Sequence, residues 1–206
     1  DYKKRGFDTL LDEFAGWEGN RITKDILNLP YFELTGVVLH EGWHKTTGLR
    51  DLVDNFSLDE CIASVIENVG AIEYSKIYRK QDVEKAKTFH KETKVWVDYI
   101  MKYHTLLKES YRHPNWKIHK KKLLEEASKE KTKLIKTMYT TGVKRNFAKK
   151  DKINNAYFYY YHTYCKYYHE VDCLVKQLGL EESIRFLKRY KSADKCLKGL
   201  YEMLDA

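Results

Sequence analysis

The sequence contains few of the residues that interrupt helices or cross-link small folds. Its 206 residues include two prolines, at positions 30 and 114, ten glycines and four cysteines. So few helix-breaking residues favour long helices over many short strands, and four scattered cysteines do not form a disulfide framework. No apolar run reaches the roughly eighteen residues of a membrane span, since the run from Tyr31 to Leu39 is too short. We therefore expect a mainly α-helical fold with little or no β structure.

The length and the apolar content of 43% allow one domain with a substantial core. We expect a single domain over residues 1–206. It begins with an irregular segment over 1–30 and a helix pair over 31–80, and continues with an α-hairpin over 82–140 and C-terminal helices over 151–206. The hairpin is expected because apolar residues recur at spacings of three and four on both sides of Pro114. These residues include Ala86, Phe89, Trp96, Ile100, Tyr103 and Leu107 before it, and Leu124, Ala127, Leu134 and Met138 after it.

Lysine and arginine are concentrated in one stretch. The net charge is +8, and residues 117–152 hold thirteen Lys or Arg against four Asp or Glu. An anionic partner such as nucleic acid, a membrane surface or an acidic peptide is one interpretation. The other is a solvated helix face, which we favour because no arginine-rich or aromatic-interleaved nucleic-acid motif accompanies the charge. We therefore expect no specific nucleic-acid partner.

The stretch His40-Glu41-Gly42-Trp43-His44 has the form H-E-x-x-H. Residues four apart on an α-helix lie about 40° apart around the axis, so His40 and His44 share one face and can bind one tetrahedral cation. Glu41 is rotated by about 100°, which keeps it off the metal but close to a water that a hydrolase must deprotonate. The spacing thus predicts two metal ligands and one general base.

A second helix is expected to complete the site. The stretch from Ser57 to Glu67 resembles the second ligand helix of the gluzincins, where the position of Glu60 is the third ligand. The alternative is that Ser57 and Glu60 form a capping box and serve only the helix start. Glu67 lies two turns further on the same face, and is a candidate for orienting a ligand histidine or for an ordinary salt bridge. A metzincin is excluded, because Thr47 and Arg50 stand where it needs Gly and His.

Three motifs together resemble the predicted zinc aminopeptidase family of bacteria, a gluzincin-like group. They are His40-Glu41-x-x-His44, Leu58-Asp59-Glu60-x-x-Ala63-x-x-x-Glu67-x-x-Gly70, and Asn154-Asn155-Ala156 with Thr163-Tyr164. The similarity spans nearly the whole chain, and the 82–140 hairpin is its least specific part. Gly42-Trp43 departs from the small or leucine-like residues usual inside the motif, and we expect the family's N-terminal part to lie outside this sequence.

The resemblance implies a zinc-dependent peptidase that hydrolyses peptide bonds with one Zn²⁺ per chain. It assigns zinc binding to His40, His44 and Glu60, and the general base to Glu41. It also suggests Tyr164 as a donor to the oxyanion, and Asn154 and Asn155 as binders of the substrate backbone. An aminopeptidase further needs an acidic group for the substrate amine. The candidates are Glu33, Asp59 and Glu67, and the sequence does not choose among them.

The alternative function is a non-catalytic helical binding or scaffold module that keeps zinc for structure. Such a site normally has four protein ligands, and the fourth would come from a distant histidine. Candidates are His90, His104, His113, His119, His162 and His169. We expect a peptide or protein as partner, and membrane attachment only through a segment outside this sequence. The compartment, either exported or cytoplasmic, is left open by the sequence, as are the oligomeric state and the choice between exopeptidase and endopeptidase.

Overall fold

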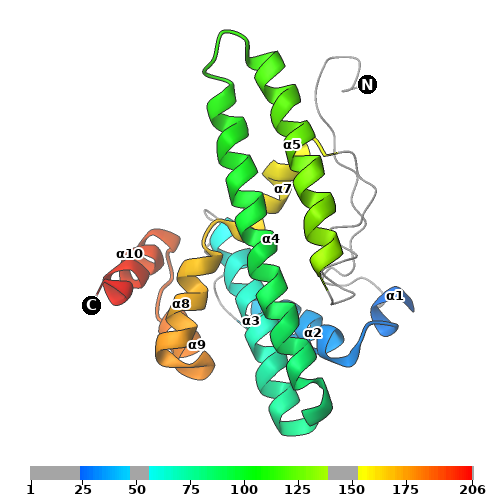
Figure 1. The fold of residues 1–206 in the computed structure, drawn as a ribbon. Helices are drawn as coiled ribbons and strands as arrows, with labels where there is room; N and C mark the ends of the chain where they lie inside the picture. Colours follow the sequence, from blue (N-terminus) through cyan, green and yellow to red (C-terminus); the bar gives the residue numbers. More distant parts are fainter. Residues whose placement is uncertain (1–23, 47–55, 139–152, 206) are drawn as a thin grey trace. The chain divides into compact units, whose positions relative to one another are not determined.

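The computed structural model describes residues 24–46, 56–138 and 153–205 (Figure 1). These residues form helices joined by turns, and no strand occurs among them, which confirms the predicted mainly α-helical class. Most of the expected irregular segment over 1–30 lies outside the described residues. Within the described part of the chain, no helix is both long and apolar enough to cross a bilayer. All four cysteines lie in this part, and none forms a disulfide.

The chain divides into two compact units. One, here called the α2–α3 unit, comprises residues 24–90 and 163–205 of the described chain, and the other, the hairpin unit, comprises its residues between 91 and 162. The boundaries fall inside two helices, α4 (Val83–Ser110) and α7 (Asn155–Cys165). Each unit therefore joins segments that are distant in sequence.

Two antiparallel helices dominate the α2–α3 unit. Helix α1 spans Lys24–Leu27, α2 spans Tyr31–Thr46 and α3 spans Phe56–Tyr78. Pro30 directly precedes α2, where a fixed φ angle suits a helix start, and its carbonyl accepts the Leu34 N–H at 2.9 Å. Tyr31 lies against Tyr74 at one end of the pair, and His44 against Glu60 at the other. Residue numbers thus rise along α2 as they fall along α3.

Two glycines allow these helices to approach closely. A Cβ atom at Gly36 would lie 2.9 Å from Glu67 Cγ, and one at Gly70 would lie 2.6 Å from Leu39 Cδ1. Both distances are shorter than a carbon–carbon van der Waals contact. The side chains of Leu58 and Ile62 are fully buried along α3. The close packing fixes the register of α2 against α3, and with it the relative positions of side chains that face across the pair.

The C-terminal helices complete this unit. They are α8 (Tyr168–Leu178), α9 (Leu180–Leu187) and α10 (Ala193–Leu204). Helices α8 and α9 pack on α3, and α10 packs on α8. Gly179 separates α8 from α9 with a φ of 81°, a left-handed conformation that glycine adopts without strain.

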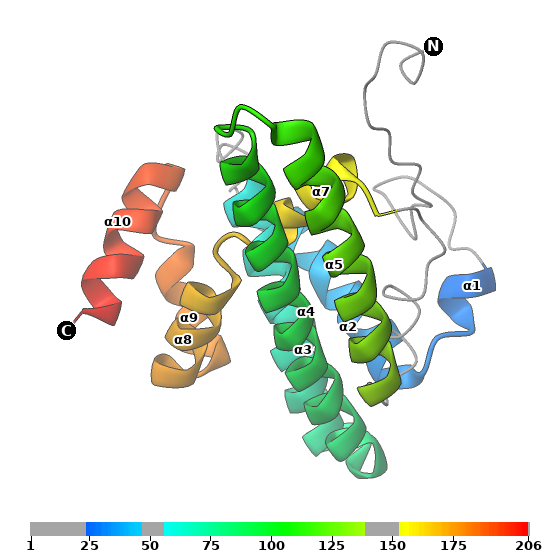
Figure 2. The same ribbon diagram turned by 45° about the horizontal axis from the view of Figure 1, so that its top comes forward.

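The hairpin unit contains α4 from residue 91 onward, α5 (Trp116–Thr137) and α7 up to residue 162. Helices α4 and α5 run antiparallel on either side of Pro114 (Figure 2). Hydroxyl groups on α4 bind α5, because Tyr99 donates to the Ala127 carbonyl at 3.0 Å and Tyr103 to Glu130 at 2.7 Å. Helix α7 adds Phe158, whose ring lies 5.7 Å from that of Tyr99. Hydrogen bonds from tyrosine hydroxyls and aromatic packing therefore both hold this unit together.

Candidate metal centre

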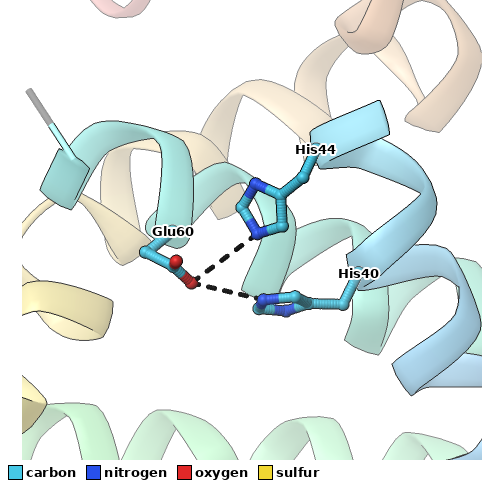
Figure 3. Close-up of side chains that lie close together, drawn as sticks. All are labelled: His40, His44 and Glu60. Carbon is cyan, nitrogen blue, oxygen red and sulfur yellow. Dashed lines mark ion pairs between the residues drawn. The ribbon is translucent and has the colours of Figure 1, made fainter. Parts of the chain in front are cut away.

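Three side chains from α2 and α3 converge on one point (Figure 3). Glu60 Oε2 lies 3.2 Å from Nε2 of His40 and 3.8 Å from Nε2 of His44. One ligand atom from each residue lies within 4.8 Å of the other two, and no other cluster of three such side chains occurs in the described residues. The histidines come together because they are one helical turn apart, and Glu60 because the register of α3 brings it opposite them.

The second nitrogen of each imidazole faces another carboxylate. His40 Nδ1 lies 3.1 Å from Glu67 Oε2, and His44 Nδ1 lies 2.7 Å from Asp59 Oδ2. Because a carboxylate only accepts hydrogen bonds, each Nδ1 carries the hydrogen. Each neutral imidazole then presents a lone pair at Nε2, toward Glu60.

The buried carboxylate oxygen of Glu60 shows that this point favours a positive charge. Glu60 is 7% exposed, and its buried Oε2 faces the Nε2 atoms of both histidines. With hydrogen on both Nδ1 atoms, two neutral imidazoles would turn only lone pairs toward Glu60, so this point favours either a proton on an Nε2 atom or a cation between the three groups. Burial opposes charge on His40, but hydrogen bonds to Glu60 and Glu67 outweigh it and raise the pKa of His40 from 6.5 to about 10. A metal ion would replace the proton that this pKa describes.

The donor set fits zinc. Two imidazole nitrogens and one carboxylate oxygen form the His₂Glu set of catalytic zinc sites, whereas magnesium and calcium prefer oxygen ligands. Ligand atoms of a tetrahedral zinc ion are separated by about 3.3 Å, close to the 3.2 and 3.8 Å found between Glu60 Oε2 and the two Nε2 atoms. These three residues would hold the ion and leave one position for substrate or water.

The capping interpretation of Glu60 is not favoured. Helix α3 begins at Phe56, so Ser57 already lies inside the first turn. The carboxylate of Glu60 is directed at the two histidines. Its position in the helix is therefore better explained by its contacts with the two histidines.

The remaining histidines of the α2–α3 unit do not join the cluster. His90 Nε2 lies 3.0 Å from Asp172 Oδ1, and its Nδ1 lies 3.2 Å from the Tyr168 hydroxyl. His169 is exposed on α8. Among the described residues of this unit, no fourth histidine, cysteine or carboxylate therefore completes a closed, structural zinc site.

Comparison with known proteins supplies a family. A family model described as "Putative aminopeptidase" matches residues 2–200. The chain belongs to this family. The resemblance deduced from the motifs is thus confirmed at the level of the aminopeptidase family. No curated protein and no solved structure matches the chain.

Two further residues of the α2–α3 unit, Glu41 and Tyr164, are predicted to act on the substrate. Glu41 is half-buried on α2, next to His40. Tyr164 lies in the last turn of α7, which is held close to α3, because Cys61 Sγ donates to the Thr163 carbonyl at 3.5 Å and accepts the Tyr167 N–H at 3.2 Å. Cys61 directly follows Glu60, so the backbone on either side of Tyr164 is anchored beside a candidate metal ligand. The roles of Glu41 and Tyr164 stay predictions.

The two asparagines lie in the hairpin unit. Asn154 Oδ1 accepts the Tyr157 N–H at 3.0 Å, which caps the start of α7. Asn155 donates through Nδ2 to the Tyr111 hydroxyl. Both therefore have structural partners there, and their predicted binding of substrate stays a prediction.

Asp59 has a role at this site that the sequence did not reveal. The sequence offered it only as one of three candidates for binding the substrate amine, whereas in the structure it contacts His44. The sequence signal that could have revealed this contact is the position of Asp59 directly before Glu60. An acidic residue beside Glu60 at the start of α3 can reach His44, the second histidine of the motif.

Proposed function

We propose that the protein is a zinc-dependent peptidase in which His40, His44 and Glu60 hold one zinc ion per chain. One observation carries the proposal: Glu60 Oε2 and two Nε2 atoms converge while carboxylates hold both Nδ1 atoms. Membership of the aminopeptidase family supports peptide hydrolysis as the reaction. Among the described residues, no fourth side chain completes the donor set, which agrees with a catalytic rather than a structural ion.

The residues around the ion divide the chemistry between them. Zinc in this donor set supplies Lewis-acid polarisation of a peptide carbonyl and acidifies water. Glu41 accepts a proton from the attacking water and returns it to the leaving amine. The Tyr164 hydroxyl donates to the carbonyl oxygen as negative charge develops there. Asp59 and Glu67 keep the ligand histidines oriented.

The choice between exopeptidase and endopeptidase depends on an acidic group for the substrate amine. Asp59 and Glu67 already bind the ligand histidines, and Glu33 is only 5% exposed. None of the three acidic candidates is thus singled out as the group that binds a substrate amine. Matched peptides with free and acetylated N-termini decide the question, because an aminopeptidase cleaves only the first, whereas an endopeptidase cleaves both.

The proposal is tested by separating zinc binding from hydrolysis. Glu41→Gln should keep about one zinc per chain by elemental analysis but lower peptide hydrolysis by about 10²- to 10⁴-fold, the usual contribution of a general base. Glu202→Gln, on the exposed face of α10, is the matched control and should change neither. The scaffold alternative predicts that zinc stabilises the fold while Glu41→Gln alters nothing measurable.

A further inference from the structure

We propose that Asp59 and Trp43 act as a positioning pair that selects the metal-binding form of His44. The inference rests on the proposed zinc site, adds Trp43 to it, and assigns Asp59 the selection of one tautomer. Neither residue contacts the metal position in this scheme. Their effect reaches it through the orientation and the hydrogen placement of one imidazole.

The two oxygens of Asp59 bind two neighbours on α2. Oδ1 accepts the Trp43 indole N–H at 2.8 Å, and Oδ2 lies 2.7 Å from His44 Nδ1. Trp43 is 3% exposed, so its ring is fixed by packing. Because the indole is also only a donor, it holds Oδ1 and aims Oδ2 at His44.

The consequence for His44 is a single tautomer. The carboxylate can only accept, so His44 Nδ1 carries the hydrogen and Nε2 keeps its lone pair for the ion. Nε2 is the atom that lies 3.8 Å from Glu60 Oε2. The pair therefore orients His44 before any ion arrives, which lowers the entropy lost on binding.

Replacing Asp59 by Asn tests this logic with almost no change of shape. An Asn side chain has one acceptor and one donor end. The Trp43 N–H takes the acceptor end, so the amide nitrogen faces His44. His44 Nδ1 must then accept, and the hydrogen moves to Nε2, where it blocks the metal. Asp59→Asn should therefore weaken zinc binding more than Asp59→Ala, which leaves room for water to act as acceptor.

Trp43→Phe removes the donor that fixes the orientation of the amide. In the Asp59→Asn background it lets the amide turn, so that its oxygen accepts from His44 again. The double variant should thus bind zinc more tightly than Asp59→Asn alone, although each single change weakens binding. Such a reversal of sign is not expected of two residues that merely support the fold.

The experiment measures the zinc dissociation constant of the whole chain by competition with a chromophoric chelator. We expect Asp59→Asn to raise it by about 100-fold and Asp59→Ala by about tenfold, within the range for outer partners of zinc histidines. Trp43→Phe alone should raise it by about fivefold, the value of an ordinary hydrogen bond. Far-UV circular dichroism of the metal-free variants checks folding. If Trp43→Phe does not fold, comparing the zinc dissociation constants of Asp59→Asn and Asp59→Ala still tests the inference.

Two results overturn the inference. One is a dissociation constant for Asp59→Asn within twofold of wild type, or no weaker than that of Asp59→Ala. The other is a folded double variant that binds zinc no better than Asp59→Asn. Failure of the proposed function is distinct from both, because the wild-type chain itself would then bind no zinc, and the inference would fall with it.

Discussion

The histidines of the two units have different neighbours, and the difference explains their chemistry. In the α2–α3 unit, His40, His44 and His90 each lie within 3.1 Å of a carboxylate. In the hairpin unit, the rings of His104 and His162 stack at 3.7 Å, and those of His113 and His119 at 4.6 Å. Carboxylates raise the pKa of His40 to about 10, whereas burial and then the charge of Lys108 lower that of His104. Neighbouring carboxylates therefore separate these histidines from the packed ones of the hairpin unit, and the convergence with Glu60 separates His40 and His44 from His90.

The largest expected effect separates the two groups of histidines directly. His40→Ala removes one of three ligands and should raise the zinc dissociation constant by at least about 100-fold, since a two-ligand site no longer has the catalytic donor set. His104→Ala, in the hairpin unit, is the matched control and should leave it within about twofold. Isothermal titration with zinc measures both. Equal losses in the two variants would break the comparison, because metal binding would then depend on a global property of the fold.

The close approach of α2 and α3 provides a second, smaller effect. Gly36→Ala places a Cβ 2.9 Å from Glu67 Cγ, which should push Glu67 away from His40 and destabilise the protein by about 1–3 kcal/mol, as overpacking does. Zinc binding should weaken as well. Gly42→Ala, six residues on in the same helix, meets nothing within 4 Å.

Because alanine is the better helix former, Gly42→Ala should stabilise α2 by about 0.5–1 kcal/mol. Urea unfolding of the metal-free protein measures both changes. A Gly36→Ala variant as stable as Gly42→Ala would show that the register of α2 against α3 does not depend on this contact.

The smallest effect concerns pH and the hairpin unit. Since the folded pKa of His104 is lowered, folding favours its neutral form. Stability from this residue is therefore fully present above the unfolded pKa near 6.5 and is lost as the pH falls from that value through the lower folded pKa. His104→Gln should reduce the loss of stability between pH 7.5 and 5, as measured by the midpoint of urea unfolding. A midpoint that falls by the same amount in both proteins would contradict this.

Much of the fold followed from periodicity alone. Spacings of three and four predicted the long helices, and Pro114 predicted the turn between α4 and α5. The face shared by His40 and His44 is a property of any α-helix, so it too could be predicted. The position of Glu60 came from a family resemblance, because helical periodicity does not say which residue of a second helix faces the first.

Other features depend on the packing between helices and were not predictable. Asp59 and Glu60 are adjacent in sequence, yet one binds an imidazole Nδ1 and the other faces two Nε2 atoms. Only the register of α3 against α2, fixed by contacts such as Gly36 with Glu67, decides between these roles. The hydrogen bond from Trp43 to Asp59 depends on the same register. Local sequence therefore predicted which residues were candidates, and packing decided how they are paired.

The most direct test of the zinc site is a crystal structure of the zinc-loaded protein with anomalous scattering measured at the zinc edge. We expect one peak about 2.0–2.2 Å from Nε2 of His40, Nε2 of His44 and a carboxylate oxygen of Glu60. The fourth position should hold water or another exchangeable ligand. A peak elsewhere, or one completed by a fourth protein side chain, would contradict a catalytic site built from these three residues.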